Sequence, residues 1–277
     1  MNNIFFFISY LVAFAIIVIA VFALVDGLRS KGRISRALNM SLFLITLPKG
    51  GDDPPAGGQR PEKELISIME QLYSSLSNLH SSGWSKFLYG EPYISLEMAV
   101  HHLGEEIHFY VSVPKSYEHI FEKQLNGIFP QANLDKIKDY NIFNPNGSSA
   151  AAFLKTKENS ILPIRTYQKL ETDPLGAIAN SLSKLEREGE GAAVQIIIRP
   201  SHHTEIRTLA QKVAKEMQSG FDFQTAMKRV KNPPTKEQDS KDAEKSQPPR
   251  VVTPYEEEIV KAIQSKVSKP LFDTNIN

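Results

Sequence analysis

Histidine and carboxylate residues gather at one turn of the sequence, and they are the best candidates for chemistry. His101, His102 and His108 lie close together, with Glu105 and Glu106 between them. Imidazole and carboxylate groups are good zinc ligands. However, the spacing contains no His-x-x-x-His pair of a metal-binding helix, and neighbouring strand residues such as His101 and His102 point to opposite faces. Polar residues at the end of a hairpin explain the cluster more simply, and a metal-dependent enzyme using the His101–His108 hairpin is the alternative.

Other motifs that carry chemistry are missing from the sequence. There is no Cys, which excludes disulfides, thiolate zinc sites and a cysteine nucleophile. No Gly-x-x-x-x-Gly-Lys-Ser/Thr string occurs, so the phosphate loop of ATPase motors is absent. His202 and His203 stand at the start of a predicted helix, where capping and solvent contacts are the usual roles. We therefore predict that the chain is not an enzyme and has no catalytic residue, no cofactor and no metal ligand.

Nucleic-acid binding is a second alternative. Phe109 and Tyr110 fall in a predicted strand, and split βαβ sheets can stack single-stranded bases on such aromatics. As neighbours, however, the two rings face opposite sides of the strand. The chain has 32 Lys and Arg residues against 31 Asp and Glu residues, a net charge of +1, so no bulk positive charge attracts nucleic acid. We expect contact with nucleic acid only indirectly, through partners.

The element that must position everything else is an apolar run at the N-terminal end. Residues 4–25 carry no charged side chain, and about 20 apolar residues at 1.5 Å each cross the roughly 30 Å hydrocarbon core of a bilayer. The sequence predicts a single transmembrane helix here. The side chains taken to anchor it are Ile4, Phe7, Leu11, Phe14, Ile17, Val21 and Val25. A cleaved signal peptide is the alternative, but it would need a basic start and a shorter apolar core.

The residues that follow the run indicate its orientation. Arg29, Lys31, Arg33 and Arg36 form a basic flank against the single acid Asp26. The positive-inside rule then places the C-terminal body in the cytoplasm and the N-terminus outside, as a single-pass membrane protein. The same basic flank suits contact with anionic lipid headgroups.

Behind this flank the hydrophobic pattern alternates between strands and helices. The expected elements are a strand at 36–48, a helix at 61–82, strands at 93–101 and 106–113, a helix at 115–129 and a strand at 133–143. This order is that of the split βαβ, or ferredoxin-like, plan, with two helices on one face of an antiparallel sheet. We assign residues 36–145 to such a domain.

A second α/β half-domain is predicted at residues 148–220. Its expected elements are strands at 150–157 and 160–167, a helix at 173–189, a strand at 192–199 and a helix at 201–220. Residues 221–253 are predicted to be a disordered linker, because apolar residues become scarce there. Residues 254–277 are expected to form a helix and the first strand of a following domain that the chain lacks. The predicted fold class is therefore α+β, with antiparallel sheets and helices on one face.

Several segments of the body resemble a known family. In chain order they are MEQLYSSL (69–76), EEIHFYVSVP (105–114), EKQLNGIFPQA (122–132), DYNIF (139–143), ILPIRTYQKLETDPL (161–175), SLSKLEREGEGAAVQIIIRP (181–200) and SKPLFDTNI (268–276). Together they resemble the N-terminal region of membrane-anchored bacterial ATPases of the type IV secretion and conjugative DNA-transfer class, a region catalogued as a domain of unknown function. The resemblance implies a body at the bacterial inner membrane that precedes a nucleotide-driven motor. Because the motor motifs are absent, no catalytic residue is carried over.

These observations together predict a non-catalytic, membrane-anchored cytoplasmic module that positions a motor and docks partner subunits. The expected partners are the lipid bilayer and a secretion-type ATPase or other secretion subunits. A homo-oligomer is also compatible with the sequence.

Overall fold

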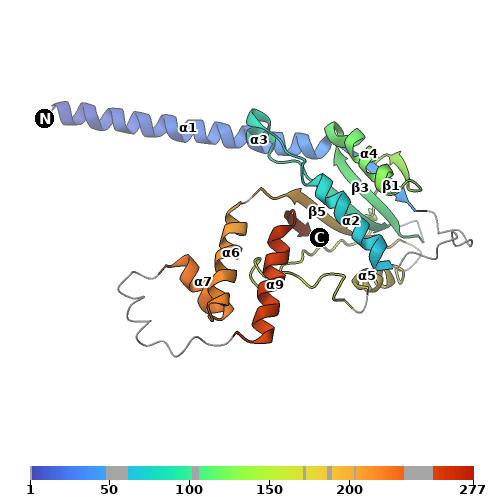
Figure 1. Ribbon diagram of the computed structural model, residues 1–277. Coiled ribbons are helices and arrows are strands. Elements are labelled where there is room, and N and C mark those ends of the chain that lie inside the picture. The colour runs from blue at the N-terminus through green and yellow to red at the C-terminus, as the bar shows by residue number, and fades with distance from the viewer. Residues whose placement is uncertain are drawn as a thin grey trace, which may run out of the picture.

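The protein consists of a long N-terminal helix, a six-stranded sheet and a lobe of helices, as the computed structural model in Figure 1 shows. The structure describes residues 2–47, 62–101, 106–170, 173–185, 189–202, 204–233 and 252–277. Sheet and helices are mixed, and every neighbouring pair of strands is antiparallel. The predicted α+β class is therefore confirmed.

Helix α1 (Asn2–Leu38) contains the apolar run and continues well beyond it. Its most apolar stretch has a mean hydropathy of 2.8 and is not buried against the rest of the protein, so α1 is long and apolar enough to span a membrane. The strand expected from Arg36 begins only at Met40. Residues 26–38 include three Arg, two Leu, one Lys and one Ala, which favour helix, and no Pro interrupts them, so the helix runs on to Leu38.

The sheet has the strand order β4-β1-β3-β2-β5-β6. Its strands are β1 (Met40–Thr46), β2 (Ile94–Val100), β3 (His108–Pro114), β4 (Asn133–Ile137), β5 (Ala192–Pro200) and β6 (Phe272–Ile276). The first five were expected close to these positions, and the strand expected at the C-terminal end pairs with β5. The described strands thus form one sheet rather than the separate sheets that the sequence suggested.

Two helices, α2 (Glu62–Leu76) and α4 (Glu118–Ile128), pack on one face of this sheet (Figure 1). The shared core contains Phe43, Leu72, Leu76, Leu79, Ile94, Val111, Val113, Phe121, Leu125 and Ile198. Alternate strand residues and one stripe of each helix supply these side chains, as the periodicity predicted. A short 3₁₀ turn (Lys115–Tyr117) leads into α4. The ferredoxin-like assignment itself stays a prediction, because the sheet continues into β5 and β6.

The predicted strands at 150–157 and 160–167 are wrong. The described chain is irregular there, apart from a single bridge between Leu154 and Ile276. Ile161 is buried, but it packs into the helical lobe rather than onto the sheet. The apolar residue Ile161 therefore packs against helices instead of pairing in a sheet, and the apolar pattern alone does not distinguish these two cases. The next helix, α5 (Pro174–Leu182), forms where Asp173 caps its first turn through the backbone N–H of Leu175.

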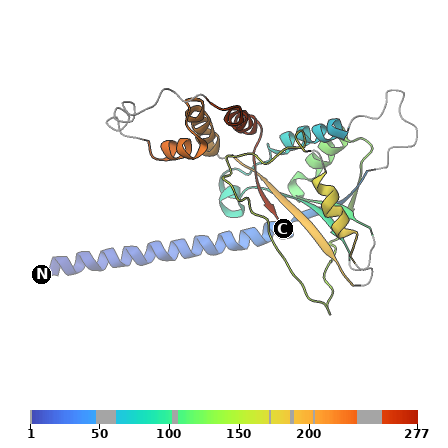
Figure 2. The same ribbon diagram turned by 90° about the horizontal axis from the view of Figure 1, so that it is seen from below.

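The helical lobe lies between β5 and β6 in the chain and projects from one end of the sheet (Figures 1 and 2). It contains α6 (Thr204–Gln218), α7 (Phe223–Lys231) and α9 (Pro254–Ser268) around the buried residues Met217 and Ile263. The prediction of disorder was wrong for residues 223–231, because an Asp222 cap and buried Ala226 and Met227 stabilise α7. The rest of the predicted linker from 234 to 251 lies outside the described residues. The proposed domain boundaries stay predictions.

Candidate functional site

The histidine hairpin of the sequence is only partly described, because His102 and Glu105 lie outside the described residues. The rings of His101 and His108 are 5.2 Å apart between centroids, and His101 Nε2 shares a hydrogen bond of 2.7 Å with the Tyr110 hydroxyl. No group of three or more His, Asp or Glu residues that could hold a metal occurs among the described residues. The zinc hypothesis therefore gains no support from the geometry.

A polar cluster instead occupies the sheet face opposite α2 and α4. Glu97 accepts hydrogen bonds from the Tyr140 hydroxyl (2.5 Å), the Gln195 amide (2.8 Å) and the Ser95 hydroxyl (2.6 Å). The Tyr140 ring stacks on Tyr110, with centroids 4.4 Å apart. Burial, with the hydrogen bond to Glu97, raises the pKa of Tyr140 well above its ordinary value, so its hydroxyl stays a donor. This cluster fastens the segment after β4 to the sheet.

The aromatic pair considered for nucleic-acid stacking is divided between the two faces. Tyr110 is only 3% exposed beneath Tyr140, whereas Phe109 is half exposed on the other face, opposite Ile45 and Met98 in register. The two rings therefore form no common stacking platform, which is the role that the alternative gave them.

The predicted anchor residues lie on the part of α1 that is not buried against the body. Phe7, Leu11, Phe14, Ile17 and Val21 are exposed, as a lipid-facing helix requires, whereas Val25 is half-buried. The side chain of Ile4 lies outside the described part of the chain.

Two members of the basic flank contact the protein itself rather than projecting toward lipid. Arg29 Nε donates to the Phe87 carbonyl at 3.1 Å, and its guanidinium lies 4.4 Å from the centroid of the Phe87 ring. Arg36 donates to the Gly90 carbonyl (2.6 Å) and to the Ser81 hydroxyl (3.1 Å). Lys31 is exposed, and the side chain of Arg33 is outside the description. The flank thus joins α1 to the chain between α2 and β2, a role that its charge alone did not predict.

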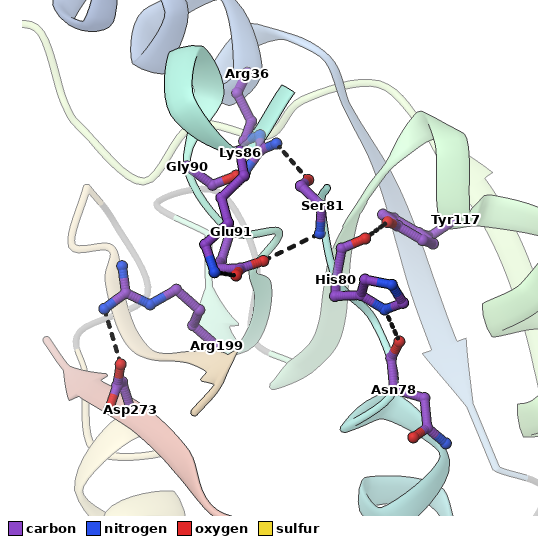
Figure 3. A network of polar contacts seen from close by, with 10 residues as sticks. All are labelled: Arg36, Asn78, His80, Ser81, Lys86, Gly90, Glu91, Tyr117, Arg199 and Asp273. Atoms are coloured by element: carbon purple, nitrogen blue, oxygen red, sulfur yellow. Dashed lines mark hydrogen bonds and ion pairs between the residues drawn. The ribbon is translucent and has the colours of Figure 1, made fainter. Parts of the chain in front are cut away.

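This connection, which we call the junction, is built on a short helix that the sequence analysis missed. Helix α3 (Gly83–Tyr89) lies against α1, and the chain on either side of it supplies the partners of Arg36 (Figures 1 and 3). Its signal was the spacing of Trp84, Phe87 and Leu88 at i, i+3 and i+4. The helix expected at 61–82 ends at Leu76, and α3 begins at Gly83, whose positive φ of 54° is a backbone conformation that Gly adopts readily.

A half-buried carboxylate holds the junction together. Glu91 pairs with Lys86 at 2.6 Å and accepts the backbone N–H of Ser81 at 3.0 Å (Figure 3). Burial alone would raise the pKa of Glu91, but the hydrogen bonds from Lys86 and Ser81 outweigh it and hold the pKa below its ordinary value. The ring of His202 lies edge-on to that of His80, 6.4 Å away between centroids, and His203 is outside the described residues.

An open cavity of about 590 Å³ separates the junction from the edge of the sheet. Arg36 and Tyr89 line one side, and Arg199 and Asp273 line the other. Both arginines already have protein partners, since Arg199 pairs with Asp273 at 2.9 Å and Arg36 bonds to the junction. The charged side chains named here are therefore already paired with other groups of the protein, and they do not form a catalytic arrangement of acid, base and nucleophile.

The lowered pKa of Glu91 predicts that the junction weakens in acid. A carboxylate whose folded pKa lies below its unfolded value of 4.5 stabilises the fold fully above 4.5 and loses that effect as the pH falls through the folded pKa. We expect Glu91→Gln to lower the thermal midpoint at neutral pH. The difference in thermal midpoint between the variant and the native chain should disappear well below pH 4.5. Circular dichroism of the full chain in detergent measures both.

Glu258→Gln is the matched control for this prediction, because Glu258 forms an exposed ion pair with Lys169. Exposed ion pairs contribute little to the stability of a fold, so this variant should have the thermal midpoint of the native chain both at neutral pH and in acid. A gap for Glu91→Gln that is the same in acid as at neutral pH would contradict the assigned role of Glu91.

The fold and the junction define a class: an α+β protein with a helix long enough to span a membrane, joined closely to its body. Residues 59–276 match a domain of unknown function, DUF8128, and since this is most of the chain, the protein belongs to that family. No curated protein and no solved structure matches the chain. The family match agrees with the expected domain of unknown function, and it carries no link to type IV secretion ATPases.

Proposed function

We propose that this chain is a non-catalytic, single-pass membrane module that holds its α+β body at the cytoplasmic face of the bacterial inner membrane. There it docks other subunits of a type IV secretion or DNA-translocation system. One observation carries the proposal: α1 is apolar enough to span a bilayer and runs without a break into a bonded junction with the body. A body attached in this way stays within reach of other membrane-bound subunits.

The charge around α1 supports the orientation. Four basic residues, Arg29, Lys31, Arg33 and Arg36, follow the apolar run, and no basic residue precedes it. Such an asymmetry retains the basic side in the cytoplasm. That Arg29 and Arg36 also bond to the body does not alter this argument, because the rule concerns charge beside the span during insertion.

Exposed apolar side chains support docking of a protein partner. Phe153, Leu154 and Ile164 are exposed on the irregular segment between β4 and α5. Large apolar side chains left exposed on one segment are compatible with a protein interface, because a partner that covers them removes apolar surface from water. The choice of a secretion-type ATPase as the partner depends on the resemblance of segments such as residues 69–76 and 161–175 to that class. A second copy of the chain is an alternative occupant of this surface.

Affinity purification from native membranes tests the proposal. The full chain, extracted in mild detergent, should bring with it a nucleotide-hydrolysing subunit. Replacing Phe153 and Ile164 together by Ser should reduce its recovery to a small fraction, whereas the matched control Tyr255→Ser, an exposed aromatic on α9, should not. Repeated captures of the intact chain that contain no such subunit would refute the assembly role.

A further inference from the structure

Helix α3 presents aromatic side chains outward instead of burying them. Trp84 is 79% exposed, Tyr89 is 41% exposed and Phe87 is 39% exposed, and we call these three residues the aromatic patch. The Trp84 and Phe87 rings meet edge to face, with centroids 5.9 Å apart. Exposing large aromatic rings to water forfeits the stabilisation that their burial brings, so a group of them indicates a surface that is covered in the working protein.

The position of the patch along α1 indicates what covers it. Phe87 is fastened to Arg29, both by the hydrogen bond from Arg29 Nε and by the stacked guanidinium. Arg29 lies four residues beyond Val25, which is about 6 Å along a helix axis. The headgroup layer on each side of a bilayer is roughly 5–7 Å thick. If the apolar run fills the hydrocarbon core, the patch lies at the level of the headgroups.

The helical lobe adds a constraint on how α1 crosses the membrane. Figures 1 and 2 show the lobe extending back toward the N-terminal side of the molecule, in the same direction as α1. Its α7 ends in Lys228, Arg229 and Lys231, so it belongs outside the hydrocarbon. A tilt of α1 away from the lobe raises the lobe from the membrane, and transmembrane helices tilt by about 20° on average, with a range up to about 40°.

The chemistry of the patch matches this location. Trp and Tyr are enriched where membrane meets water, because their rings are apolar and their N–H or O–H groups are polar. Lys86 on α3 remains half exposed although it pairs with Glu91, and it therefore places a positive charge on the same short helix as the patch. Cations next to interfacial aromatics favour anionic headgroups.

We infer that the aromatic patch of α3 docks into the headgroup layer of the same membrane that α1 spans, with a preference for anionic lipid. The body then meets the bilayer at a second point beside the helix. This inference depends on the proposed membrane anchoring, and it adds to that proposal the surface of the body that touches lipid.

Trp84 is the only tryptophan of the chain, so its fluorescence reports on the patch without labelling. The full chain is reconstituted into vesicles of equal parts phosphatidylcholine and phosphatidylglycerol, with bromine on the acyl chains close to the headgroup. In the same vesicles without bromine we expect the Trp84 emission to lie to the blue of that of a water-exposed indole, because the headgroup layer is less polar than water, and we expect bromine to reduce this emission by about half. In vesicles of phosphatidylcholine alone the quenching should be weaker.

A second reporter provides the control. In the variant Trp84→Phe with Tyr255→Trp, the only tryptophan lies at the exposed start of α9, the end of the lobe away from α1 (Figure 1). Bromine should leave its emission unchanged. Flotation of the same vesicles separates the two hypotheses. A chain that floats while Trp84 stays unquenched overturns the inference and assigns the patch to a protein partner, whereas a chain that does not float overturns the anchoring itself.

Discussion

Two arginines in the middle of α1 should release the protein from the membrane. Ile17→Arg with Val18→Arg exchanges two favourable apolar residues for two charged ones, a change of about 6–8 kcal/mol in the free energy of insertion. The whole apolar run favours insertion by only about −5 kcal/mol on the same scale. We therefore expect the native chain to remain in the membrane pellet after alkaline extraction and the double variant to leave it.

The control for this experiment keeps the run apolar. Ile17→Leu with Val18→Leu changes shape but not hydrophobicity, and it should stay in the pellet with the native chain. Alkaline extraction removes proteins held only by surface contacts, so binding through the aromatic patch does not mask the result. Retention of the double-arginine variant in the pellet would exclude residues 4–25 as the anchor.

Local periodicity was sufficient for most elements of the body. Apolar residues at helical spacing located α2, α4, α6 and α9, alternation located β2 and β3, and a nearly continuous apolar run located β5. Each of these elements buries one face, either in the core between sheet and helices or in the core of the lobe, and this one-sided burial gives a regular apolar pattern in the sequence. Elements whose partners lie far away in the chain were harder to predict. The chain around Ile161 was interpreted as a strand, but its partner is the lobe formed by α6 and α9.

The prediction of short elements failed for a different reason. Helices α3 and α7 contain too few residues for a clear period, and their ends depend on single residues such as Gly83 and Asp222. An Asp that accepts two backbone N–H groups starts a helix even where composition favours disorder. The average composition of a segment does not reveal a single capping residue, so the linker predicted from composition included residues that form a helix.

The candidate site was predictable only in part. The apolar run and the basic flank are visible in the sequence because membranes impose their requirements on continuous segments. The junction, by contrast, depends on Arg36 reaching the Gly90 carbonyl, a pair that only the folded chain brings together. Exposure of Trp84 could not be predicted either, because a lone tryptophan is usually largely buried.

The core beneath α2 and α4 should be the most sensitive part of the body to truncation. Phe43 is 1% exposed in β1, which lies between β4 and β3, and its ring lies 6.3 Å from that of Phe121 on α4. Phe43→Ala removes this bridge between sheet and helix and leaves a cavity, at a cost of about 3–5 kcal/mol. Since small domains are stable by only about 5–15 kcal/mol, we expect a large fall in the thermal midpoint.

Circular dichroism of the full chain in detergent measures this fall, because the strands and helices of the body melt while α1 stays in the micelle. Phe153→Ala is the matched control: it truncates the same residue type at a position that is 71% exposed. Surface truncations usually change stability by less than about 0.5 kcal/mol. Equal midpoints for the two variants would mean that Phe43 does not join sheet to helix, and the described core would then be wrong.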